Sequence, residues 1–163
     1  MPSGPVAAMG GRPIGRIPVM DVQPTLEGGA WPTIAVVDEE VLVTAVVFRE
    51  GHDAVNASVV LTDPAGVAHL APMTCTNPGL MTWAATVSAD RPGPWTFRVE
   101  GWSDPYGTWE HDAAIKVAAG VDVELMLEEG ARLLERARDE VERTPDAVAM
   151  LTAGARTLRN ITL

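Results

Sequence analysis

The sequence has very few of the residues that carry metal and covalent chemistry. It contains one cysteine, Cys75, which cannot form an internal disulfide and has no second cysteine nearby to help bind a metal. Its three histidines, His52, His69 and His111, lack the spacing of a metal site. No glycine-rich phosphate loop follows a predicted strand, and the sequence has no G-x-S-x-G motif. We therefore expect no cofactor, no metal and no catalytic residue.

Positive charge and long apolar runs are also scarce. Lysine occurs once, at Lys116, and the 12 basic residues stand against 22 acidic ones, which leaves a net charge of −10. This acidity, with arginines dispersed or interleaved with glutamate, argues against nucleic acid or an anionic membrane as partner. No apolar run reaches the roughly 18 residues of a membrane-spanning helix. The start has no secretory signal pattern, so we expect a cytoplasmic protein in which residues 1–15, rich in Gly and Pro, form a disordered leader.

Most of the chain has the pattern of short strands separated by turns. Val41–Phe48 is dense in β-branched residues, and Trp83 and Trp95 lie in phase with apolar neighbours, which predicts that both are core residues. Strands are predicted over 16–22 at a sheet edge, 41–48, 58–61, 69–74, 82–87 and 95–100, with a further extended run after a turn at 103–107 that passes through Ile115 and Val117. This pattern predicts an immunoglobulin-like antiparallel β-sandwich over residues 16–118.

After residue 120 the apolar period changes to that of a helix. Asp122 can cap a first helix, and Thr144-Pro145-Asp146 places a capping hydroxyl, a proline and an acid at the start of a second helix that runs to about Arg159. Two helices alone cover their apolar stripe poorly, and that stripe contains Leu127, Leu134 and Val141. The predicted fold is therefore mainly β with an α appendage, in which residues 119–163 are the first helices of a truncated helical bundle.

Two His–Asp dipeptides and two tryptophans are the candidate functional residues. Adjacent residues on an extended strand point to opposite faces, so neither His52-Asp53 nor His111-Asp112 can form its own pair, and we expect structural hydrogen bonds instead. Trp102 and Trp109 flank the predicted turn at 103–107. We expect at least one of them to be exposed, where it can anchor a docked domain or stack on a sugar ring, and we favour docking.

Five stretches of the sequence resemble one enzyme family. They are RIPVMDVQP at 16–24, FREGHDAV at 48–55, RVEGWSDP at 98–105, TWEHDAAIKV at 108–117 and AGVDVELMLEEGARLLERA at 119–137. Together they resemble the N-terminal region of bacterial α-1,4-glucan:maltose-1-phosphate maltosyltransferases. The chain departs from the family pattern at Gly101, where alanine is expected, and at Tyr106-Gly107, where the family turn is often more apolar.

The resemblance implies an intracellular enzyme of the α-amylase-like glycoside hydrolase class. Such an enzyme transfers maltosyl units from α-maltose 1-phosphate to the non-reducing end of an α-1,4-glucan, with retention and release of phosphate, and forms a homodimer. The family's catalytic (β/α)₈ barrel has no counterpart in these residues, so no catalytic residue carries over. We interpret the chain as the non-catalytic assembly and support region of such an enzyme, inactive alone and dimeric.

Two other functions stay open. An independent glucan-binding module would require Trp102 and Trp109 on one exposed ledge, and a plain protein-interaction domain would require the helical tail to pair with another chain. In the assembly interpretation, the residues expected to make interdomain or dimer contacts are Arg49, His52, Asp53, Trp102, Asp104, Trp109, His111, Asp112, Leu127, Leu134 and Val141.

Overall fold

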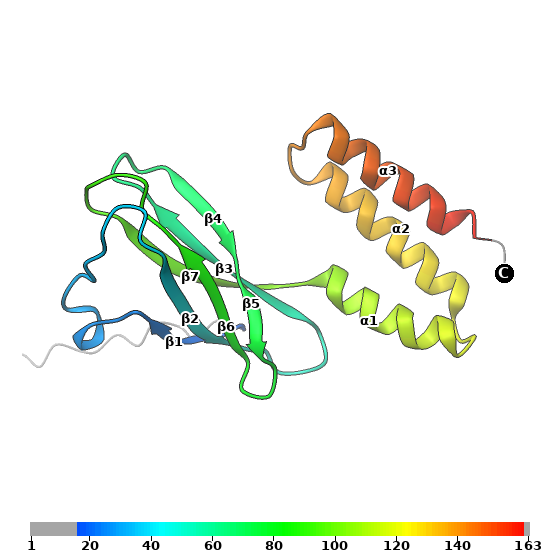
Figure 1. Cartoon of the computed structure of the whole chain (residues 1–163). Helices are drawn as coiled ribbons and strands as arrows, with labels where there is room; N and C mark the ends of the chain where they lie inside the picture. The colour runs from blue at the N-terminus through cyan, green and yellow to red at the C-terminus, as the bar shows by residue number, and fades with distance from the viewer. Residues whose placement is uncertain (1–15, 162–163) are drawn as a thin grey trace, which may run out of the picture. The chain divides into compact units, whose positions relative to one another are not determined.

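The computed structural model describes residues 16–161 (Figure 1). The leader predicted for residues 1–15 lies outside the described residues. The chain forms two compact units. A β-unit runs up to Glu50 and resumes over Ser58–Gly101, and a helical unit takes the segment Gly51–Ala57 together with the residues from Trp102 onward.

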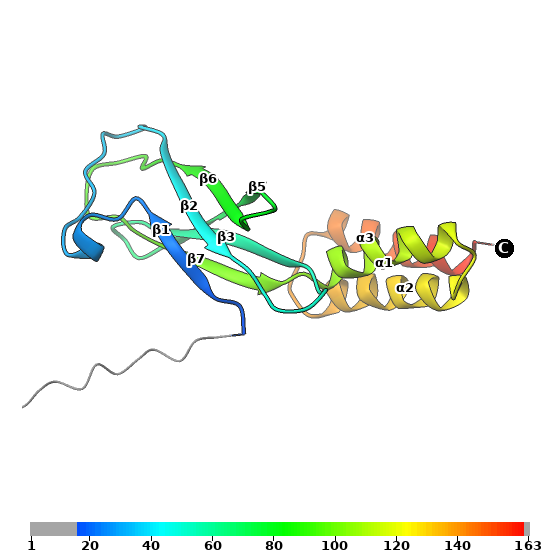
Figure 2. The ribbon, with the colours of Figure 1, turned by 90° about the horizontal axis from the view of Figure 1, so that it is seen from below.

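The β-unit contains two antiparallel sheets, as the strand pattern predicts. The larger sheet has the order β1 (Val19–Gln23), β2 (Val41–Val47), β6 (Thr82–Val87) and β5 (Thr74–Asn77), and the smaller has the order β4 (Ala68–Pro72), β3 (Val55–Thr62) and β7 (Thr96–Ser103). Figure 2 shows β2 and β6 in one layer and β3 and β7 in the other. The first strand lies at a sheet edge, as expected for a strand that ends beside a proline.

The core of the β-unit follows from the side-chain alternation of its strands. Along β2, Val43, Ala45 and Val47 are buried while the residues between them are not, which is the period of two that a strand with one covered face requires. The prediction for Trp83 is confirmed: its side chain is buried, and its indole N–H donates to the Val47 carbonyl over 3.0 Å. Trp95, the other predicted core tryptophan, is only half-buried.

The extended run predicted through Ile115 and Val117 is wrong. Residues Pro105–Ala118 form the helix α1, and no turn separates them from β7. The Asp104 carboxylate accepts a hydrogen bond from the backbone N–H of Gly107 over 2.9 Å, and Pro105 occupies the first helical position. Asp followed by Pro suits a turn and a helix start equally well, and here it begins a helix.

The two helices of the tail lie beyond α1. They are α2 (Val123–Asp139) and α3 (Pro145–Arg159), and the predicted end at Arg159 is confirmed. The Thr144 hydroxyl accepts from the Ala147 backbone N–H over 3.3 Å, which is the cap that the sequence predicts. The cap predicted at Asp122 is wrong in mechanism, because this residue adopts a left-handed backbone conformation and its side chain makes no capping hydrogen bond.

The helical unit includes α1, so the change from one compact unit to the other falls between Gly101 and Trp102. The domain limits 16–118 and 119–163 stay predictions. Along the described part of the chain, none of the helices combines the length and apolarity needed to cross a lipid bilayer.

Candidate functional site

Trp109 packs inside the helical unit. It lies on α1, half-buried, and its six-membered ring occupies the space beside Gly130 of α2 so closely that a methyl group on Gly130 would lie 2.2 Å from its Cζ2 atom. Its indole N–H donates to the Met126 carbonyl over 2.7 Å, and the Tyr106 ring lies 5.5 Å away between centroids. Trp109 therefore joins α1 to α2, and the large exposed indole face that a sugar-binding ledge needs is not present there.

Trp102 is separate from this contact. It lies in β7 and is 42% exposed, which confirms that one of the two tryptophans is open to solvent. The structure does not bring Trp102 and Trp109 together on an exposed ledge, since one lies on a strand and the other is held under α2. The glucan-binding alternative loses the pair of aromatic residues on which it was based.

Asp104 holds the segment 51–57, a loop and the start of β3, against the start of α1. Its backbone N–H donates to the Ala54 carbonyl over 2.9 Å, and the Ala54 N–H in turn donates to the Thr108 hydroxyl over 2.8 Å. The Asn56 side-chain amide lies 3.4 Å from the second carboxylate oxygen of Asp104. The carboxylate is thus committed to capping and to the loop, which is a structural role for a residue proposed as a contact.

The two His–Asp dipeptides lie in different kinds of structural element. His52 and Asp53 are exposed in the loop before β3, and His111 and Asp112 are exposed on α1. The expectation that His111 and Asp112 lie on a strand is wrong, and adjacent residues on a helix also do not face each other. No group of three or more His, Cys, Asp and Glu side chains in residues 16–161 is arranged to hold a metal ion.

Arg159 of α3 is clamped between two acids of α2. Its guanidinium donates to the Glu128 carboxylate over 2.9 Å and also binds Glu135, while Arg132 donates to Glu128 over 2.8 Å. These hydrogen bonds, first from Arg159 and then from Arg132, lower the pKa of Glu128 from 4.5 to about 2. Arg159 likewise lowers the pKa of Glu135. The cluster holds the two helices side by side (Figure 1).

The proposed stripe of Leu127, Leu134 and Val141 does not lie on one exposed face. Leu127 and Leu134 are half-buried, and a methyl group on Gly154 of α3 would lie 3.0 Å from Leu134 Cδ1, so α3 itself covers Leu134. Val141 lies beyond the end of α2 and is 61% exposed. Arg49, two residues after β2, is half-buried.

The helices expose other large apolar side chains that the sequence reasoning missed. Met150 of α3 is 76% exposed, and Leu125 of α2 is 52% exposed. A search of the sequence for one repeating apolar stripe misses them, because they do not lie on the buried face of their helices. The signal that could have found them is the apolar residues left over once that face is assigned.

Asp63 is a buried acid of the β-unit. Its Oδ1 accepts from the backbone N–H groups of Ala65 and Val67 over 2.9 and 2.8 Å, and its Oδ2 lies 3.8 Å from His69 and 4.0 Å from Arg91. The Val67 N–H is the main cause of the lowered pKa of this carboxyl. Bound in this way, the Asp63 carboxylate stabilises the turn after β3.

Comparison with known proteins gives one consistent match. Residues 15–162 match the family model described as alpha-1,4-glucan:maltose-1-phosphate maltosyltransferase, domain N/S. The chain is 53% identical over 141 residues to maltosyltransferase 2 of Streptomyces coelicolor and 50% identical over 141 residues to maltosyltransferase 1 of that organism, covering 86% of this chain and 21% of each enzyme. It is 45% identical over 125 residues to the enzyme of Arcanobacterium haemolyticum, covering 76% of this chain and 18% of that enzyme. The chain thus spans about a fifth of the length of these relatives.

Proposed function

Because this chain belongs to the domain N/S family of alpha-1,4-glucan:maltose-1-phosphate maltosyltransferases, we propose that it is the non-catalytic assembly and support region of such an enzyme. The parent enzyme would transfer maltosyl units from α-maltose 1-phosphate to an α-1,4-glucan in the cytoplasm, as a homodimer. The observation that carries the proposal is the match over residues 15–162, which covers 21% of each of the two Streptomyces coelicolor enzymes.

The state of the carboxyl groups supports a non-catalytic role. Retaining transfer between sugars requires two carboxyls about 5–5.5 Å apart, one of which must carry a proton near neutral pH and therefore have a raised pKa. Among residues 16–161, every carboxyl group with a displaced pKa has that pKa lowered, by hydrogen bonds and nearby arginines; these groups are Asp63, Asp90, Glu128, Glu135 and Asp139. None of these groups can serve as the general acid.

The helical unit supports the assembly role. Solvent-exposed large apolar side chains on a small helical unit favour contact with another protein surface, because that contact removes them from water. Such side chains occur on all three helices and in the loop between α1 and α2, and they include Ile115, Val121, Leu125 and Met150. The polar residues proposed as interdomain or dimer contacts stay proposals, among them Arg49, His52, Asp53, His111 and Asp112.

A phosphate-release assay tests the proposal that this chain has no transferase activity. Residues 1–163, mixed with α-maltose 1-phosphate and glycogen, are expected to release no phosphate above a protein-free control. The full-length Streptomyces coelicolor maltosyltransferase 2 serves as the positive control. Turnover by the chain comparable to that enzyme would overturn the non-catalytic assignment.

The assembly side is tested by sedimentation. The chain is expected to self-associate, and Met150→Glu is expected to shift it toward monomer because it places a charge on an exposed apolar contact. Ala149→Glu is the matched control, since it adds the same charge at the next position of α3, which is also exposed but carries no large side chain. Equal effects of the two substitutions would show that net charge, and not a contact at Met150, controls association.

A further inference from the structure

The loop between β1 and β2 exposes apolar side chains over a long stretch. Every residue of the segment 31–40 is exposed, and five of these residues have apolar side chains: Trp31, Ile34, Ala35, Val36 and Val37. Ile34 is 91% exposed and Val36 is 73% exposed. Single exposed apolar side chains are normal on a protein surface, but several of them in one segment indicate a surface that contacts another molecule.

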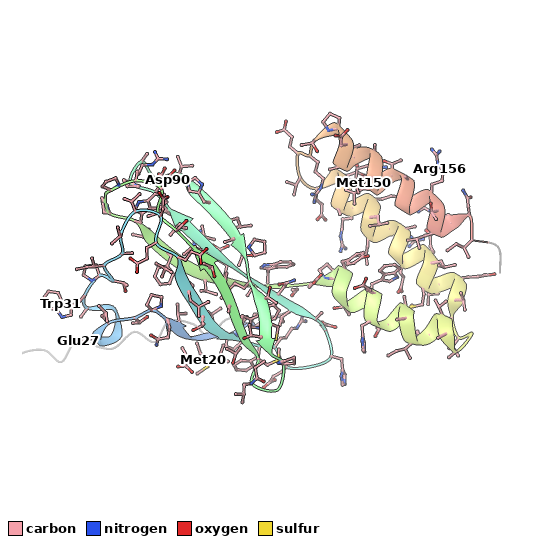
Figure 3. All side chains as sticks on the ribbon, viewed as in Figure 1. Met20, Glu27, Trp31, Asp90, Met150 and Arg156 are labelled. Atoms are coloured by element: carbon pink, nitrogen blue, oxygen red, sulfur yellow. The ribbon has the colours of Figure 1, made fainter. Side chains whose placement is uncertain are left out.

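Hydrogen bonds at both ends hold this loop in place. Near its start, Leu26 and Trp31 form an antiparallel bridge, and the Trp31 indole N–H donates to the Glu27 carboxylate over 3.0 Å. Figure 3 shows Trp31 and Glu27 together in the loop after β1. Near its end, the Asp38 backbone N–H donates to the Ala89 carbonyl over 2.8 Å, which ties the loop to the residues after β6. Because the loop is already ordered, little conformational entropy is lost when a partner covers it.

A tight turn fixes the most acidic part of the loop beside an exposed valine. The Glu39 backbone N–H donates to the Val36 carbonyl over 3.0 Å, and the Val36 N–H donates to the Glu39 carboxylate over 2.7 Å. Between these two residues, Asp38 adopts a left-handed conformation with a φ of 64°. The turn therefore keeps an apolar side chain and a carboxylate next to each other on the surface.

The loop lies in a part of the sequence that has acids and no bases. Between residues 17 and 48 there is no Lys, Arg or His, whereas this stretch contains the acids Asp21, Glu27, Asp38, Glu39 and Glu40. The carboxylates of Glu27 and Glu39 accept hydrogen bonds from uncharged N–H groups, which leave their negative charge in place. The exposed apolar side chains of the loop are thus accompanied by uncompensated negative charge.

This charge determines which occupant suits the surface. A second copy of the chain would bring a net charge of −10 against an acidic loop, and like charges disfavour such a contact. Nucleic acids and anionic membranes are disfavoured for the same reason. A protein segment with large apolar side chains flanked by arginine or lysine matches both the apolar residues and the acids.

We propose that the loop 31–40 docks a segment of another protein, in which two or three large apolar side chains are flanked by arginine or lysine. The apolar side chains of the segment cover Ile34 and Val36, and its cations lie against the acids at positions 38–40. Removal of apolar surface from water provides affinity, and charge complementarity provides selectivity and a faster association. This docking goes beyond the proposed function, and it depends neither on the transfer reaction nor on self-association.

Selection from a random peptide library, displayed on phage and applied to residues 1–163, tests the proposal. The selected peptides are expected to contain large apolar side chains flanked by arginine or lysine. Fluorescence anisotropy of one labelled selected peptide then measures its affinity for the chain and for variants of it. Circular dichroism of each variant verifies that the sheets and helices remain folded.

Two serine substitutions locate the binding surface. Ile34→Ser is expected to weaken peptide binding by about tenfold or more, as the loss of a central apolar contact does. Val36→Ser is a second variant of the same surface and is expected to weaken binding in the same direction. Leu70→Ser is the matched control, because Leu70 lies on β4 and is 67% exposed outside the loop, and it is expected to leave the affinity unchanged.

The contribution of charge is tested with Glu40→Gln, which removes one negative charge and keeps the shape of the side chain. It is expected to weaken peptide binding by about two- to fivefold, as the loss of one exposed charge pair does. Raising the salt concentration from about 0.1 to about 1 M shortens the Debye length from about 10 to about 3 Å. This change is expected to weaken binding to the unmodified chain more than binding to Glu40→Gln.

Four results would overturn the proposal. The first is that no selected peptide binds with a Kd below about 1 mM. The second is that the selected peptides contain no excess of arginine and lysine. The third is binding that Ile34→Ser leaves unchanged, or that Leu70→Ser weakens equally. The fourth is a change in the sedimentation of the chain alone caused by Ile34→Ser, which would make the loop a contact between copies. The phosphate-release test and the Met150 test of the proposed function are independent of these results.

Discussion

Replacement of Gly130 by alanine tests the contact that joins α1 to α2. A methyl group at this position would lie 2.2 Å from Trp109 Cζ2, 2.5 Å from Cε2 and 2.9 Å from Cη2. Carbon atoms do not approach this closely, and these ring atoms cannot rotate away individually. The ring edge that must move also carries the N–H bonded to the Met126 carbonyl over 2.7 Å.

Three effects set the size of the change. Overpacking of a fitted contact costs about 1–3 kcal/mol, and loss of the indole hydrogen bond costs about 1 kcal/mol. Replacing an internal helical glycine by alanine returns about 1 kcal/mol. We therefore expect Gly130→Ala to lower the unfolding free energy of the helical unit by about 1–3 kcal/mol, with a fall in Tm of roughly 4–8 °C for each kcal/mol.

The assay is urea and thermal unfolding followed by circular dichroism at a helical wavelength. Gly154→Ala in α3 is the matched control, because its methyl group would meet only the flexible end of Leu134 at 3.0 Å while gaining the same helical preference. In a Trp109→Leu background, Gly130→Ala should become neutral or stabilising. If Gly130→Ala is as stable as Gly154→Ala in the native background, the argument from ring contact is refuted.

Two further predictions concern charge and core packing. The Glu128 carboxylate is bound by Arg159 and has a pKa of about 2, against 4.5 in the unfolded chain. Its contribution to the unfolding free energy is therefore fully present above pH 4.5 and is lost as pH falls through 2. Unfolding of the helices at a series of acidic pH values should show this loss, and Glu128→Gln should make the unfolding free energy depend less steeply on pH. Trp83→Ala should destabilise the β-unit by about 3–5 kcal/mol, because it empties a buried site and leaves the Val47 carbonyl without its indole donor. Thr96→Ala, at an exposed position, should change the unfolding free energy by much less. Equal shifts in Tm for the two variants would contradict the assigned core face.

Elements with strong local signals could be predicted from the sequence. The strand Thr82–Val87 has the predicted bounds, because its alternation continues without interruption over its whole length. The helix that ends at Arg159 also has the predicted limits, because Thr144 and Pro145 supply a cap and a first position that depend only on neighbouring residues. The family is equally a property of the sequence, since its match covers residues 15–162.

The helix α1 shows where local reasoning fails. Asp104-Pro105 is compatible with a turn or with a helix start, and the apolar residues that follow are too few to distinguish the two periods. What distinguishes them is Trp109 against Gly130 and Thr108 against Ala54, contacts between residues far apart in the sequence. The short sequence windows from which a helix or strand is predicted do not contain both partners of either contact.

The difference between local patterns and contacts distant in sequence also separates what the sequence and the tertiary structure each determine about this protein. The sequence by itself determined most of the strands, the last helix, the acidic charge and the maltosyltransferase family, since periodicity, composition and similarity are all read along the chain. Only the tertiary structure decided that Trp109 is engaged inside the helical unit and that Arg159 meets two acids of α2. These contacts depend on how separate elements pack, and packing is the step at which residues distant in sequence become neighbours.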